Sequence, residues 1–185
     1  TGPAAGATLR SYALPRAPRP HTFHATAGIS ALALSDPKSE SADLLALADG
    51  RGALTVSDLA SGRRVAFLPG DGHAVAKDLA FLFDRPALAA IWPGQFRAAV
   101  WRLADANPTP LPTNLNYRRV VATRAGLVLS NYGRELHVLG ADVGLDGLPQ
   151  KMPLADGGEA VDLVASADGS TLAYLSSRGT VGITR

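Results

Sequence analysis

The segment ISALALSDPKSESADLLALADGRGALTVSDLASGRRVAFL, Ile29 to Leu68, contains four short apolar runs separated by turn-forming residues. The dipeptides Asp49-Gly50 and Ser61-Gly62 lie between runs, and such pairs favour tight turns because glycine accepts a positive φ. The segment 36–42 is a polar insertion that widens the first turn. The pattern predicts four consecutive strands, at residues 29–35, 43–48, 53–59 and 63–68.

This strand–turn unit recurs along the chain. First strands begin near Ile29, Lys77, Val120 and Val161, at intervals of 48, 43 and 41 residues. The predicted units are 7–25 (partial), 29–68, 77–113, 118–154 and 160–185 (partial), all within one domain spanning residues 1–185. The further predicted strands are 7–14, 22–25, 77–83, 87–92, 97–103, 118–123, 127–131, 135–139, 150–154, 160–166, 171–176 and 180–184.

Proline and glycine punctuate the chain about every ten residues, which leaves little room for a helix of ordinary length. Three prolines, at positions 108, 110 and 112, predict a short or distorted fourth strand in the second unit, because proline cannot donate to a ladder. Hydrophobic residues make up 46% of the chain and aromatic residues 6%, so small and branched aliphatic side chains must fill the core. We predict an all-β fold.

A period of about 40–45 residues with four strands per unit is typical of a β-propeller blade. A four-stranded sheet cannot bury both of its faces alone, whereas sheets stacked radially bury a continuous core between them. The sequence therefore predicts about four blades of four antiparallel strands, with partial units at both ends.

Several short motifs resemble those of the WD40-like β-propeller repeat family. Ser57-Asp58-Leu59 and Trp101-Arg102-Leu103 stand where that family has its Trp-Asp pair, and Gly72-His73 matches its Gly-His dipeptide. Asp49 matches the aspartate of its turn between second and third strands, and 159–185, with the turn aspartate Asp168, is similar to a repeat of this family that lacks its last strand. The resemblance implies structural roles for His73, Asp49 and Asp168 in buried hydrogen-bond networks. No unit carries the complete set, so the repeats are degenerate. Rings of this family usually have seven blades, so the resemblance implies that these blades are part of a larger ring of about seven.

Charge and composition exclude several classes of protein. The formal net charge is only +2, and the arginine pairs 63–64 and 118–119 do not form the dense basic stripe that nucleic-acid binding requires. The chain has no cysteine, and no apolar run reaches the roughly 18 residues that span a membrane. The N-terminus lacks a signal-peptide pattern, so our interpretation leans toward a cytoplasmic protein, although the sequence identifies no compartment.

An aromatic cluster beside Pro93-Gly94 is the predicted partner-binding surface. Trp92, Phe96 and Trp101 lie there together with Arg97 and Arg102. Exposed aromatic and arginine side chains are typical of binding hot spots. Packing of these aromatic side chains in the core is the alternative interpretation.

Other constellations do not predict catalysis or metal binding. His21 and His24 have HxxH spacing without neighbouring carboxylates, and the 142–146 segment offers only two carboxylates for calcium. His73 lies between Asp71 and Asp78, but no strained Gly-x-Ser-x-Gly turn supplies a nucleophile. We predict no catalytic residues, no metal and no cofactor.

We expect a non-catalytic propeller scaffold for protein–protein interaction, with a protein partner and with the remaining blades on another chain or segment. The alternative is a sensor or regulatory propeller of a larger enzyme, a kinase or peptidase, whose catalytic domain is absent from this chain. A third hypothesis is an enzyme with its ligand in the central channel, for which Asp71, His73 and Asp78 are the candidate residues.

Overall fold

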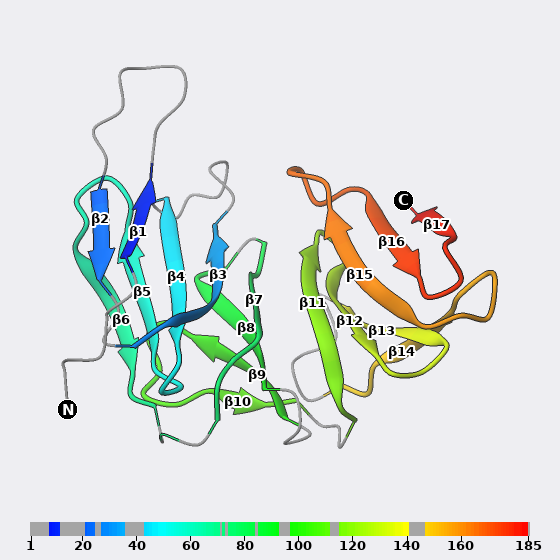
Figure 1. Ribbon diagram of the computed structural model, residues 1–185, viewed down its shortest axis with the longest axis horizontal. Helices are drawn as coiled ribbons and strands as arrows, with labels where there is room; N and C mark the ends of the chain where they lie inside the picture. The colour runs from blue at the N-terminus through cyan, green and yellow to red at the C-terminus, as the bar shows by residue number, and fades with distance from the viewer. Residues whose placement is uncertain are drawn as a thin grey trace.

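In the computed structural model, every helix-or-strand element of the described residues is a β-strand (Figure 1). The structure describes residues 8–11, 21–24, 27–35, 43–70, 72, 74–83, 85–92, 97–111, 115–140 and 147–184. No helix in these ranges is long and apolar enough to cross a membrane. The all-β prediction is confirmed.

The Ile29–Leu68 segment folds into one antiparallel sheet whose strands pair in chain order. Its strands are β3 (Ile29–Leu34), β4 (Leu44–Asp49), β5 (Leu54–Asp58) and β6 (Arg64–Leu68). The side chain of Asp49 closes the β4–β5 turn, because one carboxylate oxygen accepts the amide hydrogens of Arg51 and Ala53, each at 2.9 Å. Gly52 in this turn has a φ of +84°, a conformation that favours glycine. The Asp49 side chain thus closes the turn as its position suggested, but the positive φ lies at Gly52 and not at Gly50.

Two further four-stranded sheets follow, again with strands paired in chain order. The second sheet contains β7 (Asp78–Phe81), β8 (Ala87–Trp92), β9 (Arg97–Arg102) and β10 (Thr109–Pro110). The third contains β11 (Tyr117–Thr123), β12 (Gly126–Asn131), β13 (Glu135–Gly140) and β14 (Gln150–Pro153). Strand β10 has two residues and lies at the edge, as predicted from the prolines around it.

The two ends of the described chain form smaller sheets. The last sheet has three described strands, β15 (Ala160–Ala165), β16 (Leu172–Ser176) and β17 (Val181–Thr184). The first is a pair, β1 (Thr8–Ser11) with β2 (His21–His24). The predicted strands are therefore present, with boundaries shifted by a few residues at most places.

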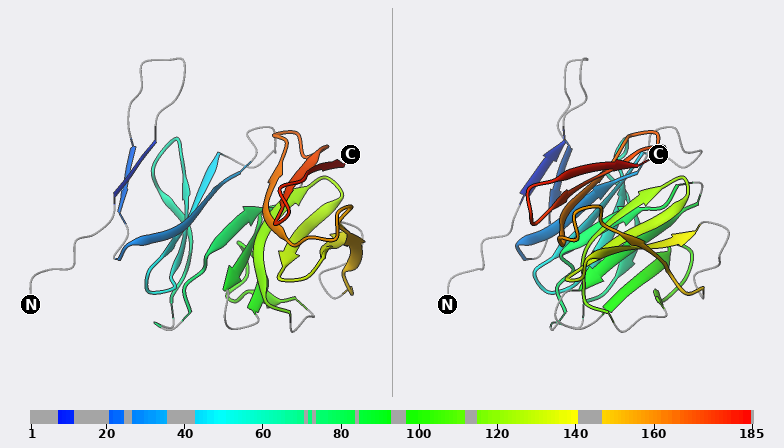
Figure 2. Two further views of the ribbon diagram at one scale, coloured as in Figure 1. Left: turned by 45° about the vertical axis from the view of Figure 1, so that its right-hand side comes forward. Right: turned by 90° about the vertical axis from the view of Figure 1, so that its right-hand side faces the viewer.

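The sheets follow one another in chain order through the molecule (Figures 1 and 2). A separate apolar cluster fills each interface between neighbouring sheets. Small residues dominate the first interface, where Ala46 and Ala48 of β4 meet Leu79 and Leu88 of the second sheet. Phe23 of β2 packs on Leu45 and Leu47, on the opposite face of β4. Because aromatic residues are scarce, alanine and leucine carry most of this packing.

Burial along the second strands shows which sheets have neighbours on both sides. All six residues of β4 and all six of β8 are buried, and β12 is buried from Leu127 onward. A strand with one covered face would alternate between buried and exposed positions. These three sheets are therefore covered on both faces.

The first strands of consecutive sheets contact one another, β3 with β7, β7 with β11, and β11 with β15. Polar groups tie these neighbours together. Ser30 Oγ donates to the carbonyl oxygen of Ala76 at 2.7 Å, and Asp78 Oδ2 accepts the amide hydrogen of Val120 at 2.8 Å. The strands and their sheets are thus as predicted, whereas closure of the sheets into a ring stays a prediction.

Candidate functional site

In three of the sheets, the second strand ends at a buried polar residue. Asp49 ends β4, Asn131 ends β12 and Ser176 ends β16, and all three side chains are buried. Each accepts a backbone amide hydrogen of the following turn; Asn131 Oδ1, for example, accepts that of Gly133 at 2.7 Å. A polar side chain here satisfies turn amides that would otherwise lie unpaired.

In the second sheet this position holds Trp92. An indole has no acceptor for turn amides, so it plays a different role from Asp49, Asn131 and Ser176. Trp92 is 9% exposed and belongs to the apolar cluster between the first and second sheets. Because Trp92 stands where the other three sheets have a polar residue, we take the interface between the first and second sheets as the candidate site.

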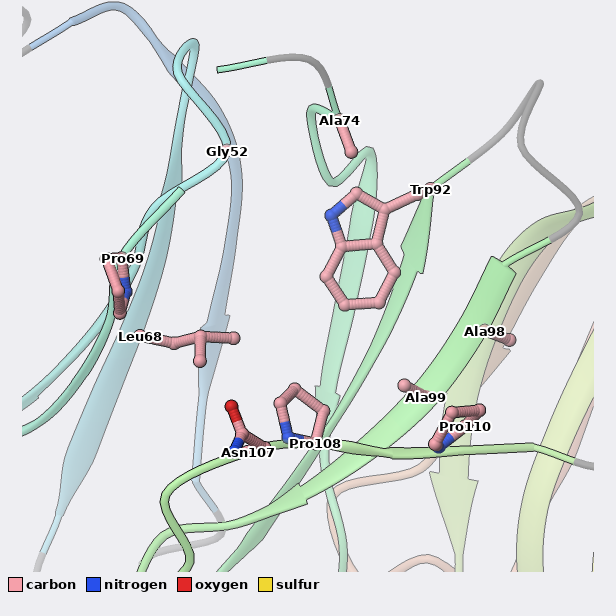
Figure 3. A pocket seen from close by; sticks show the side chains of 10 residues that line it. All are labelled: Gly52, Leu68, Pro69, Ala74, Trp92, Ala98, Ala99, Asn107, Pro108 and Pro110. Carbon is pink, nitrogen blue, oxygen red and sulfur yellow. The ribbon is translucent and has the colours of Figure 1, made fainter. Parts of the chain in front are cut away.

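A cavity of about 290 Å³ lies beside Trp92, between the first sheet and the second (Figure 3). Leu68 and Pro69 form the wall from the first sheet, and Ala99 of β9 lines the opposite side. All ten lining residues are uncharged: Gly52, Leu68, Pro69, Ala74, Trp92, Ala98, Ala99, Asn107, Pro108 and Pro110. Such a cavity suits an uncharged group that has both apolar and polar parts.

Glycine makes the approach of the two walls possible. A Cβ atom on Gly52 would lie 2.1 Å from the carbonyl oxygen of Ala74, and one on Gly70 would lie 2.1 Å from that of Arg51. Both distances are far below van der Waals contact, so larger residues would push these segments apart. The loop chemistry of the first sheet therefore shapes one side of the cavity.

The two tryptophans of the predicted surface differ in their hydrogen bonding. Trp101 is 2% exposed, and its indole Nε1 donates to the carbonyl oxygen of Asp105 at 3.0 Å. Trp92 Nε1 has no acceptor among the residues that the structure describes. Figure 3 shows the indole turned into the space between the two sheets.

The rest of the predicted partner surface is only partly described. Arg102 is exposed at the end of β9, the side chain of Arg97 is not described, and Phe96 lies outside the described residues. Both tryptophans pack in the interior, which is the alternative that the sequence left open. Whether Trp92, Phe96, Arg97, Trp101 and Arg102 bind a partner stays a prediction.

Of the three residues predicted to have structural roles, two lie within the described residues and one does not. Asp49 is buried and closes its turn, whereas His73 lies outside the described residues. Asp168 accepts hydrogen bonds from the hydroxyls of Ser166 and Ser170, and these bonds lower the pKa of Asp168 to about 2. Asp168 thus stabilises the β15–β16 turn within its own sheet.

A buried network in the third sheet has no counterpart in the sequence predictions. Tyr117 and His137 are each 1% exposed, and the Tyr117 hydroxyl lies 3.0 Å from His137 Nδ1. His137 Nε2 lies 3.2 Å from Glu135 Oε1, and Lys151 Nζ lies 2.9 Å from the same oxygen. The hydrogen bonds to Lys151 and then His137 lower the pKa of Glu135. The network joins β11, β13 and β14, and its buried pair, Tyr117 and His137, is 20 residues apart, so spacing does not reveal it.

Charged residues also meet where the first strands adjoin. Arg119 Nε of β11 lies 3.2 Å from Asp162 Oδ1 of β15, and Asp78 of β7 binds the neighbouring Val120 amide. Burial raises the pKa of Asp78, and the Val120 hydrogen bond opposes this only in part. Of the channel candidates Asp71, His73 and Asp78, only Asp78 lies within the described residues.

A second cavity, of about 370 Å³, is lined by residues of all four first strands and the segments that follow them. Phe81, Phe83 and Val121 make most of its surface apolar, and Ser35 and Ser166 add hydroxyl groups. In the described ranges no group of three or more histidine, aspartate or glutamate side chains is placed to hold a metal ion. The four first strands therefore line a common cavity, and no metal-binding cluster lies there among the described residues.

No protein-family model matches the chain, and no curated protein matches it. Among solved structures, the chain is similar to the crystal structure of the computationally designed Ika4 protein. The TM-score is 0.59 at 17% sequence identity, and the match covers 85% of this chain and 91% of that chain. At this identity the likeness concerns the fold alone.

Proposed function

We propose that this protein is a non-catalytic scaffold for protein–protein interaction, built as a degenerate WD40-like propeller whose blades are the four successive sheets. Three features support the proposal: the antiparallel order of strands within each sheet, the contact between successive first strands, and the cavity that all four first strands share. Radial stacking of blades accounts for all three.

The observation that carries the binding function is an uncovered apolar face on the β15–β17 sheet. Val164, Leu175, Val181 and Ile183 are 62%, 41%, 65% and 68% exposed. Leu175 pairs with Val181, and Ala173 pairs with both Val164 and Ile183, so these side chains share one face of the sheet. A contiguous apolar patch of this kind marks an interaction surface.

The partner that fits this face is another apolar sheet. Inside the molecule each equivalent face is covered by the next sheet, through clusters of alanine, leucine and valine. We propose that the β15–β17 face takes a further blade of a larger ring, supplied by another chain or segment. In the described residues β17 is also an edge strand, and its backbone is open to pairing.

Affinity capture from the cells that produce the protein tests the binding surface. The Ile183→Glu variant places a carboxylate on the apolar face, and we expect it to lose partners that the unaltered chain recovers. Leu148→Glu is the matched control, because Leu148 is 81% exposed and lies before β14, away from this face. Equal recovery by both variants would exclude this face, and absence of any specific partner would contradict the scaffold function.

Light scattering coupled to size exclusion, with small-angle scattering on the same sample, tests the larger ring. We expect the isolated chain either to associate or to scatter as an open arc. A monodisperse monomer whose scattering fits a closed ring of four blades would contradict a ring of about seven.

A further inference from the structure

The cavity beside Trp92 is lined by both apolar and polar groups, and no charged side chain lines it. Ala74 and Ala99 are buried in its walls, and Leu68 lies across from the indole of Trp92 (Figure 3). An ionised group would lose its hydration here without gaining a partner of opposite charge. The occupant that these walls favour is therefore neutral.

The size of the cavity limits the occupant further. A dry apolar cavity of about 150 Å³ holds one benzene molecule. The volume of about 290 Å³ beside Trp92 therefore has room for one substituted ring or two fused rings. The exposed residues Pro69, Asn107 and Pro110 line the same cavity, so it connects to solvent.

The indole of Trp92 adds a directional requirement. The residue is nine-tenths buried and the indole faces the cavity, whereas its Nε1–H has no acceptor among the described residues and is itself not a buried atom. Trp101 differs, because its Nε1–H donates to the Asp105 carbonyl oxygen. An acceptor atom on a bound molecule would satisfy Trp92 in the same way.

We propose that the Trp92 cavity is a binding site for a small uncharged aromatic molecule that carries one hydrogen-bond acceptor, such as a carbonyl oxygen or a ring nitrogen. The ring packs between Trp92, Leu68 and Ala99, and the acceptor takes the hydrogen bond of Trp92 Nε1. This site is independent of the β15–β17 face, and neither requires the other.

Proton–nitrogen correlation spectra of the indole groups test the proposal, since the chain has two tryptophans and hence two indole signals. The Trp92→Phe variant assigns them by removing one signal. On titration with benzamide, we expect a saturable downfield shift of the Trp92 signal, while the Trp101 signal, already hydrogen bonded, stays in place. Benzoate, which is charged, should produce no shift.

Toluene and two variants separate the contributions of the hydrogen bond and the walls. Toluene lacks an acceptor, and we expect it to bind about five- to tenfold more weakly than benzamide. Trp92→Phe has lost the reporting indole, so its affinity for benzamide is measured by titration calorimetry, and we expect the same loss of about five- to tenfold. Ala99→Leu should fill the cavity and abolish binding, whereas Ala173→Leu, on the outer face of β16, should not. The retained Trp101 signal shows that each variant is folded.

Two outcomes would overturn the site. Absence of any saturable shift with benzamide or toluene means that the cavity takes no aromatic molecule. Equal affinity for benzamide and toluene, or unchanged benzamide affinity in Trp92→Phe, means that the indole hydrogen bond does not select the ligand.

Discussion

The second strands β8 and β16 are built from similar residues but have different surroundings. All six residues of β8 are buried, because its sheet packs against a neighbour on each face. In β16 the burial alternates, with Leu172 and Tyr174 facing the third sheet and Leu175 41% exposed on the other side. The same local pattern thus yields a core strand or a surface strand according to its neighbours.

This difference teaches where the stability of the molecule resides. A single small sheet contributes one apolar face to each interface, so the interior sheets gain two interfaces and the β15–β17 sheet gains one. In stacked-repeat proteins stability is close to a sum of unit and nearest-neighbour terms. Substitutions in the interior sheets should therefore cost more than matched substitutions on the open face.

The largest expected contrast is between two leucines of the second strands. Leu88→Ala in β8 removes a side chain that is fully buried, and we expect it to lower the free energy of unfolding by about 2–5 kcal/mol. Leu175→Ala in β16 should cost less than about 1 kcal/mol, because much of that side chain already contacts water. Urea unfolding monitored by circular dichroism measures both, and equal costs would contradict the comparison.

The two faces of the last sheet should also differ from each other. A Cβ on Gly182 would lie 2.0 Å from the ring of Tyr174, so Gly182→Ala should cost about 1–3 kcal/mol through overpacking. Val181→Ala, one residue away on the open face, should change stability by less than about 0.5 kcal/mol. If both variants unfold at the same urea concentration, the packed face of this sheet is not as tight as described.

Removing one tyrosine hydroxyl from the third sheet and one from the last sheet compares the hydrogen bonds of these two regions. Tyr117→Phe leaves the buried His137 Nδ1 without its partner, and we expect a loss of about 1–2 kcal/mol. Tyr174→Phe removes only a 3.5 Å contact with the Ala155 amide and should cost less. Thermal unfolding of the two variants provides the measurement, and a larger effect at Tyr174 would count against a structural role for the network.

Acid titration should distinguish the carboxylates of the two regions. Hydrogen bonds from Ser176 and Ser166, respectively, lower the pKa values of Asp156 and Asp168 to about 2, so their stabilising effect is complete above the usual value of 3.8. It is lost as the pH falls from 3.8 toward about 2. Burial raises the pKa of Asp78, so its ionisation opposes folding as the pH rises through that raised value.

Carbon NMR of the carboxyl groups measures these titrations directly. We expect Asp156 and Asp168 to titrate near pH 2 and Asp78 above 3.8. In Asp168→Asn, the loss of stability between pH 3.8 and about 2 should be smaller, because asparagine does not titrate. Titration of Asp78 below 3.8 would show that the Val120 hydrogen bond outweighs its burial.

Much of the fold was predictable because turns and strands are local. The pairs Asp49-Gly50 and Ser61-Gly62 mark the turns of the first sheet, and the apolar run 87–92 is a strand with the predicted bounds. The prolines around Pro110 correctly indicated a shortened edge strand. In each case the physical cause, a φ preference or a missing amide hydrogen, lies within a few residues of the sequence.

The candidate site was less accessible, because it depends on which faces meet. The sequence singled out Trp92 and Trp101 for their type, but their burial follows from the sheets on either side. The Tyr117–His137 pair joins two separate strands, and the contact of Arg119 with Asp162 joins two separate sheets. The surroundings of Trp92 likewise depend on a second sheet. The end of β8 did carry a signal, since Trp92 replaces the polar residue that ends β4, β12 and β16.

The backbone tie between the third and fourth sheets has a consequence for how the molecule comes apart. The amide of Arg124, in the β11–β12 turn, donates to the carbonyl oxygen of Gly169 at 2.9 Å, and its guanidinium donates to that of Asp168 at 2.7 Å. Detaching the β15–β17 sheet breaks this junction and the Arg119–Asp162 contact, and it exposes Val128 and Leu136 beneath it, while the interfaces further along remain closed. We therefore expect unfolding to begin at this end, with amide exchange fastest in β17 and slower step by step toward β8.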